Sequence, residues 1–402
     1  MIALSSLSAQ TGVQFGTSGV RGLVAQMSAD VCKAYTLAFI QCLALKPGHR
    51  VAVGIDLRPS SPDIALACMD AIIESGCVVD YCGHLPTPAL ALYALQESIA
   101  AVMVTGSHIP FDRNGIKFYR ADGEITKADE AAICSATVAF QGDFLPDRLP
   151  AVNPLALARY THRYRILFSP AVLTGWRVGV YQHSSVARDC LLYLLEALGA
   201  MVVPIERTDH FVPIDTEAVS EADEERARQW VRAYGLDAIV TTDGDGDRPL
   251  IADETGQWLR GDIVGLLTAQ YLGARSVVTP VSCNTAIERS GVFETVLRTR
   301  IGSPYVIAGM QSLGAESAPV AGFEANGGFI AGPGLRCEGI DLDPLPTRDA
   351  LLPISILLVM AAQEGVRLSS LTAQLPKRFT ASDRIQSMPT ALSLALMAKL
   401  KN

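Results

Sequence analysis

The sequence repeats one local pattern three times, in which an apolar run leads into a polar turn, an amphipathic segment and a glycine. The apolar runs that begin these repeats are Val51–Asp56, Val178–Tyr181 and Val277–Val281. The amphipathic segments behind them have helical spacing and lie at 64–74, 188–198 and 286–290. Strands that alternate with helices are typical of mixed or parallel sheets covered by helices. The sequence therefore predicts an α/β fold that uses one layout three times, and the unequal spacing of the repeats excludes a solenoid.

The length supports several domains, because 402 residues exceed what one ordinary core organises. Candidate boundaries lie in the Pro- and Asp-rich stretch Asp143–Pro154, near 253–261 and near 371–377. The predicted domains are 1–148, 149–256 and 257–374. The remainder, 375–402, holds one predicted helix at Ala391–Leu400 and is too short to be a domain.

Charge and composition exclude several classes of function. The chain carries 33 Lys and Arg against 41 Asp and Glu, a net charge of −8, without a basic block, so neither nucleic acid nor an anionic membrane is an expected partner. The most apolar stretch, Ala350–Ala362, contains a proline and is too short to span a bilayer. No signal peptide is recognisable, and the nine scattered cysteines lack a C-x-x-C motif. We therefore expect a cytoplasmic protein whose cysteines are small buried hydrophobes.

A serine loop follows the apolar run Ala101–Val104. Thr105 to His108 come directly after this predicted strand, at the end where ligands gather in open α/β sheets. The hydroxyl of Ser107 needs a base or a charged partner to act as a nucleophile, and His108 and Lys117 are the nearby candidates. We expect a tight turn at 114–115 to return Lys117 to this place. The alternative is that Ser107 and His108 are ordinary polar loop residues, and the absence of G-x-S-x-G excludes an α/β-hydrolase nucleophile.

An acidic loop follows another apolar run, Leu236–Thr242. Asp243, Asp245 and Asp247 alternate with glycines and precede Arg248. Three carboxylates this close repel one another unless a cation lies between them, and oxygen ligands of this kind suit Mg²⁺ or Ca²⁺. Arg248 is placed to hold a further anionic oxygen.

An EF-hand is the competing interpretation of the acidic loop. Asp243, Asp245, Asp247 and Glu254 stand at positions 1, 3, 5 and 12 of such a loop. Position 6 is Arg248 where an EF-hand needs glycine, and apolar strands flank the loop instead of helices. The sequence therefore predicts a metal site of another type.

Two more loops have side chains suited to a sugar phosphate. Phe15–Gly22 is rich in glycine and contains Arg21, and such loops bind phosphate through backbone amides. Gly322–Phe329 places Glu324 and Asn326 two residues apart, so that both can bind vicinal sugar hydroxyls. Each loop alone is equally well explained as an ordinary turn.

Taken together, the four loops resemble those of the α-D-phosphohexomutase family. The serine loop is similar to the family's active loop, the acidic loop matches its magnesium loop, and the other two resemble its glycine/arginine and sugar-binding loops, in family order over nearly the whole chain. The resemblance implies three related α/β/α domains around a central cleft and a smaller fourth domain, of which 375–402 would be a remnant.

The resemblance also implies a mechanism of the phosphomannomutase type. A phosphoserine at position 107 would pass its phosphoryl group to a hexose phosphate, and the hexose 1,6-bisphosphate formed would return its other phosphate to the serine. The net reaction would interconvert mannose 6-phosphate and mannose 1-phosphate, and hexose 1,6-bisphosphate would act as activator. The implied roles are Mg²⁺ binding by Ser107, Asp243, Asp245 and Asp247, acid–base assistance by Arg21 and Lys117, and substrate binding by Arg248, Glu324 and Asn326. His108 would be a catalytic residue beside the nucleophile, as in the family.

The sequence departs from the family in two places that leave alternatives open. The serine loop has Ile109 where asparagine is more common, and Asn326 stands where serine is common. No arginine/serine/glycine loop that would hold the non-reacting phosphate follows Pro376. A non-catalytic sugar-phosphate-binding relative is therefore one alternative, and a Mg²⁺-dependent phosphatase is another. The choice of mannose over glucose or glucosamine rests on overall resemblance.

Overall fold

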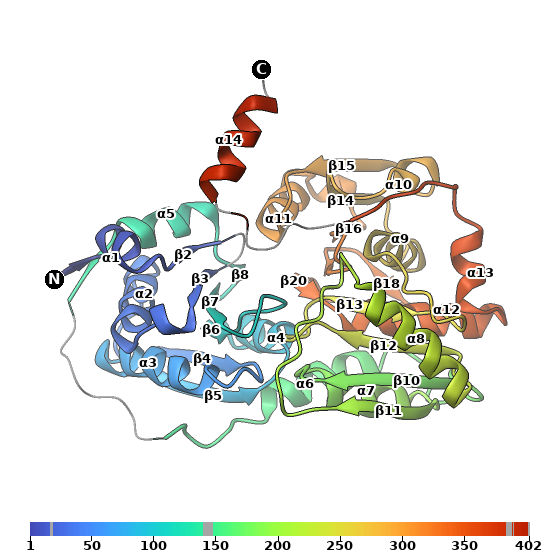
Figure 1. The fold of residues 1–402 in the computed structure, drawn as a ribbon, viewed down its shortest axis with the longest axis horizontal. Coiled ribbons are helices and arrows are strands. Elements are labelled where there is room, and N and C mark those ends of the chain that lie inside the picture. The colour runs from blue at the N-terminus through green and yellow to red at the C-terminus, as the bar shows by residue number, and fades with distance from the viewer. Residues whose placement is uncertain (17–18, 140–147, 383–387, 389, 401–402) are drawn as a thin grey trace.

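The structure, a computed structural model, describes residues 1–16, 19–139, 148–382, 388 and 390–400. Part of the predicted linker, 143–147, and residues 383–387, 389 and 401–402 of the predicted remnant lie outside this range. Three main sheets organise the rest, and Figure 1 shows them as three lobes whose strands β7, β13 and β20 lie towards the middle of the molecule.

The first lobe contains a mixed sheet with strand order β2-β3-β7-β6-β4-β5, with β8 paired to β7. A separate two-stranded sheet pairs β1 with β9. Its strands are β1 (Ile2–Ala3), β2 (Gln14–Phe15), β3 (Val20–Leu23), β4 (Arg50–Ile55), β5 (Val78–His84), β6 (Ala100–Val104), β7 (Arg113–Arg120), β8 (Gly123–Glu124) and β9 (Thr137–Val138). Its helices are α1 (Leu4–Thr11), η1 (Val24–Gln26), α2 (Ala29–Cys42), α3 (Ser61–Glu74), α4 (Thr87–Glu97) and α5 (Lys127–Ser135).

The second lobe has the strand order β11-β10-β12-β13. Its elements are α6 (Leu155–Arg165), β10 (Arg177–His183), α7 (Arg188–Ala197), β11 (Met201–Arg207), α8 (Glu221–Tyr234), β12 (Ala238–Thr242) and β13 (Pro249–Ala252).

The third lobe has the strand order β15-β14-β16-β17-β20, with a small β18-β19 hairpin beside it. Its elements are α9 (Gly261–Tyr271), β14 (Ser276–Pro280), α10 (Ala286–Arg289), β15 (Thr295–Thr299), α11 (Ser303–Ser312), η2 (Ala315–Ser317), β16 (Val320–Phe323), β17 (Phe329–Ala331), β18 (Arg336–Cys337), β19 (Ile340–Asp341), β20 (Leu345–Asp349), α12 (Leu351–Glu364) and α13 (Leu368–Ala373).

The three sheets share one topology, which confirms the predicted α/β layout used three times. In each, a central strand (β4, β10 or β14) pairs in parallel with two neighbours, and the later neighbour (β6, β12 or β16) continues into an antiparallel strand (β7, β13 or β17). The central strands are almost wholly buried and have apolar residues at their centres, as expected for strands covered on both faces. The boundaries predicted after residues 148, 256 and 374 stay predictions.

The apolar core runs through the lobes and holds them together. One buried cluster fills the face of the first sheet under α2 and α3, and a second, larger cluster continues from α4 through α6 and α7 to α9 and α12. Seven of the nine cysteines are buried, as predicted, whereas Cys42 is half-buried and Cys134 is exposed, and all nine are free thiols. The apolar run at 350–362 is part of α12, a short buried helix.

The predicted helix near the C-terminus is present as α14 (Thr390–Leu400), which projects away from the lobes in Figure 1 with exposed leucines. No helix in the described part of the chain combines the length and apolar character needed to cross a membrane.

Candidate active site

The candidate site is built from the same connection in each of the three lobes. Residues 105–112 join β6 to β7, residues 243–248 join β12 to β13, and residues 324–328 join β16 to β17. Each connection begins at the carboxyl end of a parallel strand, where side chains are free to leave the sheet. The serine, acidic and sugar loops predicted from sequence therefore occupy equivalent places, and their side chains meet between the lobes.

Ser107 is fully buried and has a left-handed backbone conformation, with φ of +52°. This conformation is uncommon outside glycine and is held here because the Ser107 amide donates to Thr105 Oγ1 at 2.8 Å. The hydroxyl then donates to Asp243 Oδ2 at 2.7 Å, which joins the serine loop to the acidic loop.

His108 lies beside the serine and is kept neutral. Its Nδ1 is 3.3 Å from Ser107 Oγ and accepts a hydrogen bond from Arg248 Nη1 at 2.9 Å. Burial, with a further contribution from the charge of Arg248, lowers the pKa of His108 to about 2. The imidazole is therefore an acceptor for Arg248 at neutral pH.

Asp56 and Arg58 hold the serine loop through hydrogen bonds. Sequence reasoning missed both residues. The Arg58 guanidinium donates to the carbonyl oxygens of Ser107, Ile109, Pro110 and Arg113 at 2.5–2.9 Å. Asp56 accepts from the Thr105 hydroxyl at 2.8 Å and from the Gly106 amide at 3.3 Å. The sequence signal was present, because two charged residues directly follow a buried strand in the run Ile55–Pro59.

The turn predicted at 114–115 is wrong. Asn114 and Gly115 lie inside β7, and the chain reverses earlier, before Arg113. The Asn114 side chain is occupied by the hydroxyls of Ser60 and Ser61, and Gly115 leaves room for the Val20 carbonyl of the adjacent strand. Lys117 nevertheless returns to the site, because β7 runs back alongside β6.

The three aspartates form a cluster that fits a divalent cation. One carboxylate oxygen of each of Asp243, Asp245 and Asp247 lies within 4.8 Å of the others, and all three residues are buried. Asp245 Oδ1 and Asp247 Oδ1 are buried without a hydrogen-bond partner among the described residues. A buried oxygen without a donor is costly, and a set of carboxylate oxygens is the donor set that Mg²⁺ prefers. The residues present therefore fit the predicted metal.

The neighbouring charges shift the pKa values of the three aspartates in different directions. Burial, followed by the like charges of Asp245 and Asp247, raises the pKa of Asp243 well above its ordinary value. Burial would also raise the pKa of Asp245, but Lys117 outweighs it and lowers the value. For Asp247, burial is likewise outweighed, here by Arg348 and Lys117.

Lys117 and Arg21 bring positive charge to the cluster. Lys117 Nζ is 2.6 Å from Asp245 Oδ2 and 2.8 Å from Asp247 Oδ2, so it stays protonated although it is buried. Arg21 lies on β3 opposite Gly115, and burial together with the charges of Arg248 and Arg348 lowers its pKa to about 10. Thr17 and Ser18 of the same loop lie outside the described residues.

The sugar loop is fixed by contacts from two lobes. Asn326 Oδ1 accepts from the Gly328 amide at 3.0 Å, and the Asn326 carbonyl accepts from the Thr216 hydroxyl at 2.8 Å. Glu324 Oε2 accepts from Arg348 Nη1 at 2.9 Å. Sequence reasoning missed Arg348, whose only signal was a charged pair, Arg348 and Asp349, ahead of the apolar helix α12.

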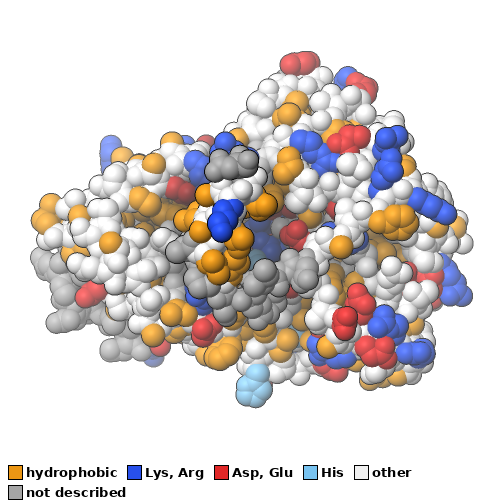
Figure 2. Space-filling model, turned by 45° about the horizontal axis from the view of Figure 1, so that its top comes forward, with side chains coloured by type: hydrophobic (Ala, Val, Ile, Leu, Met, Phe, Trp, Pro, Cys, Tyr) orange, Lys and Arg blue, Asp and Glu red, His pale blue; other side chains and the backbone are white. Residues whose placement is uncertain are grey.

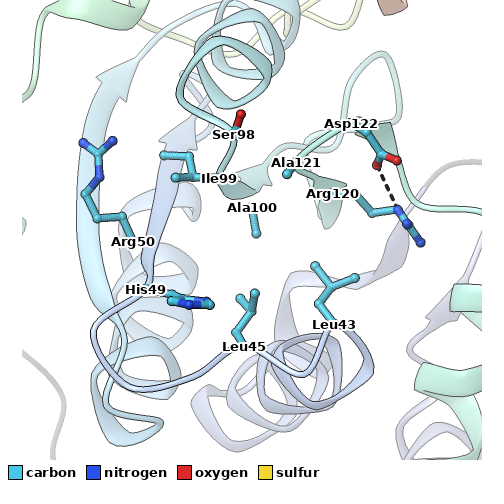
Figure 3. A pocket seen from close by; sticks show the side chains of 10 residues that line it. All are labelled: Leu43, Leu45, His49, Arg50, Ser98, Ile99, Ala100, Arg120, Ala121 and Asp122. Atoms are coloured by element: carbon cyan, nitrogen blue, oxygen red, sulfur yellow. Dashed lines mark hydrogen bonds and ion pairs between the residues drawn. The ribbon is translucent and has the colours of Figure 1, made fainter.

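Figure 2 shows the face that is hollowed between the lobes, with Lys or Arg side chains at the bottom of the hollow. A separate pocket of about 490 Å³ lies in the first lobe, where β4 and β6 begin, and Figure 3 shows it. Ser107 follows the other end of β6, so this pocket is not part of the site. Its Arg50 and Arg120 are paired with carboxylates, Arg50 with Glu97 and Arg120 with Asp122.

Comparison with known proteins gives the same assignment over most of the chain. The chain matches the family "Phosphoglucomutase/phosphomannomutase" in its alpha/beta/alpha domain I over residues 12–140, domain II over 159–256 and domain III over 260–379. It is 48% identical to a phosphomannomutase of Salmonella muenchen over 389 residues, which cover 96% of this chain and 80% of that protein. It is 45% identical to a phosphomannomutase of Sinorhizobium fredii over 400 residues, which cover 97% and 84%.

Solved structures with the same fold are more distant in sequence. A phosphoglucomutase/phosphomannomutase family protein from Burkholderia thailandensis aligns with a TM-score of 0.71 at 20% identity and covers 94% of this chain and 81% of that one. An N-acetylphosphoglucosamine mutase from Aspergillus fumigatus, in complex with GlcNAc-6P and magnesium, aligns with a TM-score of 0.55 at 15% identity and covers 99% and 91%. At these identities the likeness concerns the fold.

Proposed function

This chain belongs to the phosphoglucomutase/phosphomannomutase family, and we propose that it is a Mg²⁺-dependent phosphomannomutase that interconverts mannose 6-phosphate and mannose 1-phosphate. The observation that carries the proposal is the hydrogen bond between Ser107 Oγ and Asp243 Oδ2, 2.7 Å long. It joins the candidate nucleophile to a cluster of aspartates that fits a divalent cation, at the meeting place of the three lobes.

Ser107 is the residue that we propose to carry the phosphoryl group. In the first half-reaction the bond between phosphorus and Ser107 Oγ breaks, a bond forms from phosphorus to a hydroxyl oxygen of the hexose phosphate, and the hydroxyl proton passes to Ser107 Oγ. In the second, the original phosphate ester of the resulting hexose 1,6-bisphosphate breaks, a bond forms from its phosphorus to Ser107 Oγ, and the serine proton passes to the released sugar oxygen. Free hexose 1,6-bisphosphate would therefore serve as activator, because it can phosphorylate an empty Ser107.

The charged residues around Ser107 supply positioning and neutralisation, which are the main requirements of phosphoryl transfer. Asp243, Asp245, Asp247 and an oxygen on Ser107 would hold Mg²⁺, which offsets the charge of the phosphoryl oxygens. Lys117, which is protonated, and Arg21 assist the proton transfers. His108 orients Arg248 through Nδ1.

Arg248, Glu324 and Asn326 are proposed to bind the sugar phosphate. The carboxylate of Glu324 would accept from sugar hydroxyls, and Arg248 would hold an anionic oxygen. Mannose is supported by the two phosphomannomutases that are 45–48% identical over nearly the whole chain. The same relatives disfavour a non-catalytic binding protein, and we place the enzyme in the cytoplasm.

The test is a mutase assay with mannose 1-phosphate, Mg²⁺ and a hexose 1,6-bisphosphate. Replacing Ser107 with alanine should lower kcat roughly a thousandfold or more, because the phosphoryl acceptor is lost. Ser135→Ala, an exposed serine in the same lobe, is the matched control and should leave kcat unchanged. Normal turnover by Ser107→Ala would refute the proposal, and free phosphate release without isomerisation would indicate a phosphatase.

A further inference from the structure

Arg348 is a buried charged side chain that the sequence-based assignment of the site left without a role. It lies on β20, the outer strand of the third sheet, one residue before the strand ends. Its side chain is 4% exposed, and its stem passes over Gly328 of the sugar loop, where a Cβ would come within 2.4 Å of Arg348 Cδ. Because Gly328 has no side chain, there is space for the Arg348 side chain to pass over it.

The guanidinium of Arg348 contacts both halves of the site. Nη2 is 2.8 Å from Asp247 Oδ2 of the acidic loop, and Nη1 is 2.9 Å from Glu324 Oε2 of the sugar loop. Both carboxylates are at most 3% exposed. One planar group with donors in fixed directions thus sets the distance and orientation of two carboxylates from different lobes.

The contact with Asp247 is directed to one oxygen. Asp247 Oδ2 accepts from both Arg348 and Lys117, whereas Oδ1 is buried, lies 3.7 Å from Arg248 Nε and has no hydrogen-bond partner among the described residues. The two cations therefore hold the carboxylate by one oxygen and leave the other for a metal ion. At Glu324, Arg348 likewise donates a hydrogen bond to one carboxylate oxygen, Oε2.

We propose that Arg348 is a positioning residue that couples binding of the metal ion to binding of the hexose phosphate. The proposal rests on the function proposed above and adds a link between its two ligands. A metal ion that fixes Asp247 also fixes the guanidinium, and the guanidinium then holds Glu324 ready for the sugar hydroxyls. Binding of either ligand orders Arg348 and its two carboxylates for the other ligand as well. Each ligand should therefore tighten the binding of the other by the same factor.

The experiment measures this coupling by calorimetry, without relying on turnover. Mn²⁺ serves as the metal probe and mannose 1-phosphate as the sugar probe, both in the Ser107→Ala background, so that no reaction occurs. The Mn²⁺ dissociation constant is measured with and without saturating mannose 1-phosphate. We expect the sugar phosphate to tighten Mn²⁺ binding by about fivefold or more when Arg348 is present.

Arg348→Lys keeps the charge but replaces the fork by a single ammonium group, which can hold only one carboxylate at a time. The ratio of the two Mn²⁺ dissociation constants should therefore fall close to one. Glu324→Gln, which keeps Arg348 and the acidic loop, should also reduce the ratio while Mn²⁺ alone still binds. Adding Arg348→Lys to Glu324→Gln should then change the ratio no further.

Arg275→Lys is the matched control, because Arg275 pairs with Glu294 on the surface of the same lobe at 2.7 Å. It should keep the full coupling. The proposal is overturned if the Ser107→Ala protein that retains Arg348 shows no coupling, or if adding Arg348→Lys leaves the coupling intact. Loss of coupling in Arg275→Lys as well would also overturn it. If the protein with Ser107 intact shows mutase turnover but the Ser107→Ala protein shows no coupling between Mn²⁺ and mannose 1-phosphate binding, only this inference is refuted. If the coupling is present but turnover is not, only the proposed function is refuted.

Discussion

Individual residues of the site are held by buried groups that take no part in the proposed chemistry. Arg58 is 1% exposed, lies against Asp56 and donates to four carbonyl oxygens of the serine loop. The ring of Phe211, from the second lobe, covers the guanidinium at 3.9 Å. Arg58 therefore helps to hold the backbone of the serine loop, together with the bond from the Ser107 amide to Thr105 Oγ1.

Replacing Arg58 with methionine should destabilise the protein and impair phosphoryl transfer. The buried Asp56 carboxylate would lose its ion-pair partner and four carbonyls would lose their donor, and breaking a buried ion pair of this kind costs about 3–5 kcal/mol. Urea unfolding measures the loss, and kcat should fall more than KM rises, because the nucleophile moves while the sugar loop stays. A variant of wild-type stability would show that the contacts around Arg58 do not hold the loop.

His183 should make the stability of the protein depend on pH. Its Nε2 donates to the Thr242 carbonyl at 2.9 Å, and burial lowers its pKa from 6.5 to about 4. Between these values the unfolded chain binds a proton that the folded chain does not, so stability falls as pH decreases.

Between these two pKa values, the free energy of unfolding should fall by up to about 1.4 kcal/mol for each unit by which the pH decreases. Unfolding free energies measured from pH 7 to pH 4 should show a weaker decline in His183→Gln, whereas His210→Gln, on the surface of the same lobe, should behave as wild type. Parallel curves for the wild type and His183→Gln would contradict the prediction.

At the scale of elements, close contact between a helix and a strand places the sugar loop. Gly265 of α9 faces Phe323 at the end of β16, and a Cβ on residue 265 would lie 2.4 Å from the ring and 2.8 Å from Phe323 Cβ. Glu324 follows directly, so the position of its carboxylate depends on how closely α9 approaches β16.

Gly265→Ala should therefore raise KM for the hexose phosphate more than it lowers kcat. Overpacking costs about 1–3 kcal/mol, which exceeds the roughly 1 kcal/mol that alanine gains over glycine in a helix. Gln270→Ala, on the exposed side of the same helix, is the control and should leave KM unchanged. An unchanged KM in Gly265→Ala would mean that the helix adjusts without moving Glu324.

Elements with a strong local pattern were predictable from the sequence. The buried strands β4, β10 and β14 and the loops that carry Ser107, Asp243 and Glu324 follow from apolar runs and the rule that sites form at carboxyl ends of strands. The turn at 114–115 failed because Asn and Gly favour turns locally, whereas here β7 is held by its neighbouring strands. Arg348 was missed because its partners, Asp247 and Glu324, are distant in sequence and only the packed lobes bring them together.

At the scale of the whole molecule, the acidic loop is where the lobes meet. Asp243 accepts from Ser107 and Asp245 accepts from Thr87, both in the first lobe, and Asp247 contacts Arg348 in the third. A cation bound by these aspartates would thus relieve their mutual repulsion and tie three lobes to one point.

Mg²⁺ should therefore stabilise the protein as a whole and not the second lobe alone. At a free concentration of about 100 times its dissociation constant, it should add about 2.7 kcal/mol to the free energy of unfolding, and chelation should remove this increment. Asp245→Asn, which lowers the charge of the cluster, should abolish most of it. Hydrogen exchange should slow in all three connections, 105–112, 243–248 and 324–328, because each contacts the cluster or Arg348. Protection confined to 243–248 would mean that the metal loop responds alone and that other contacts hold the lobes together.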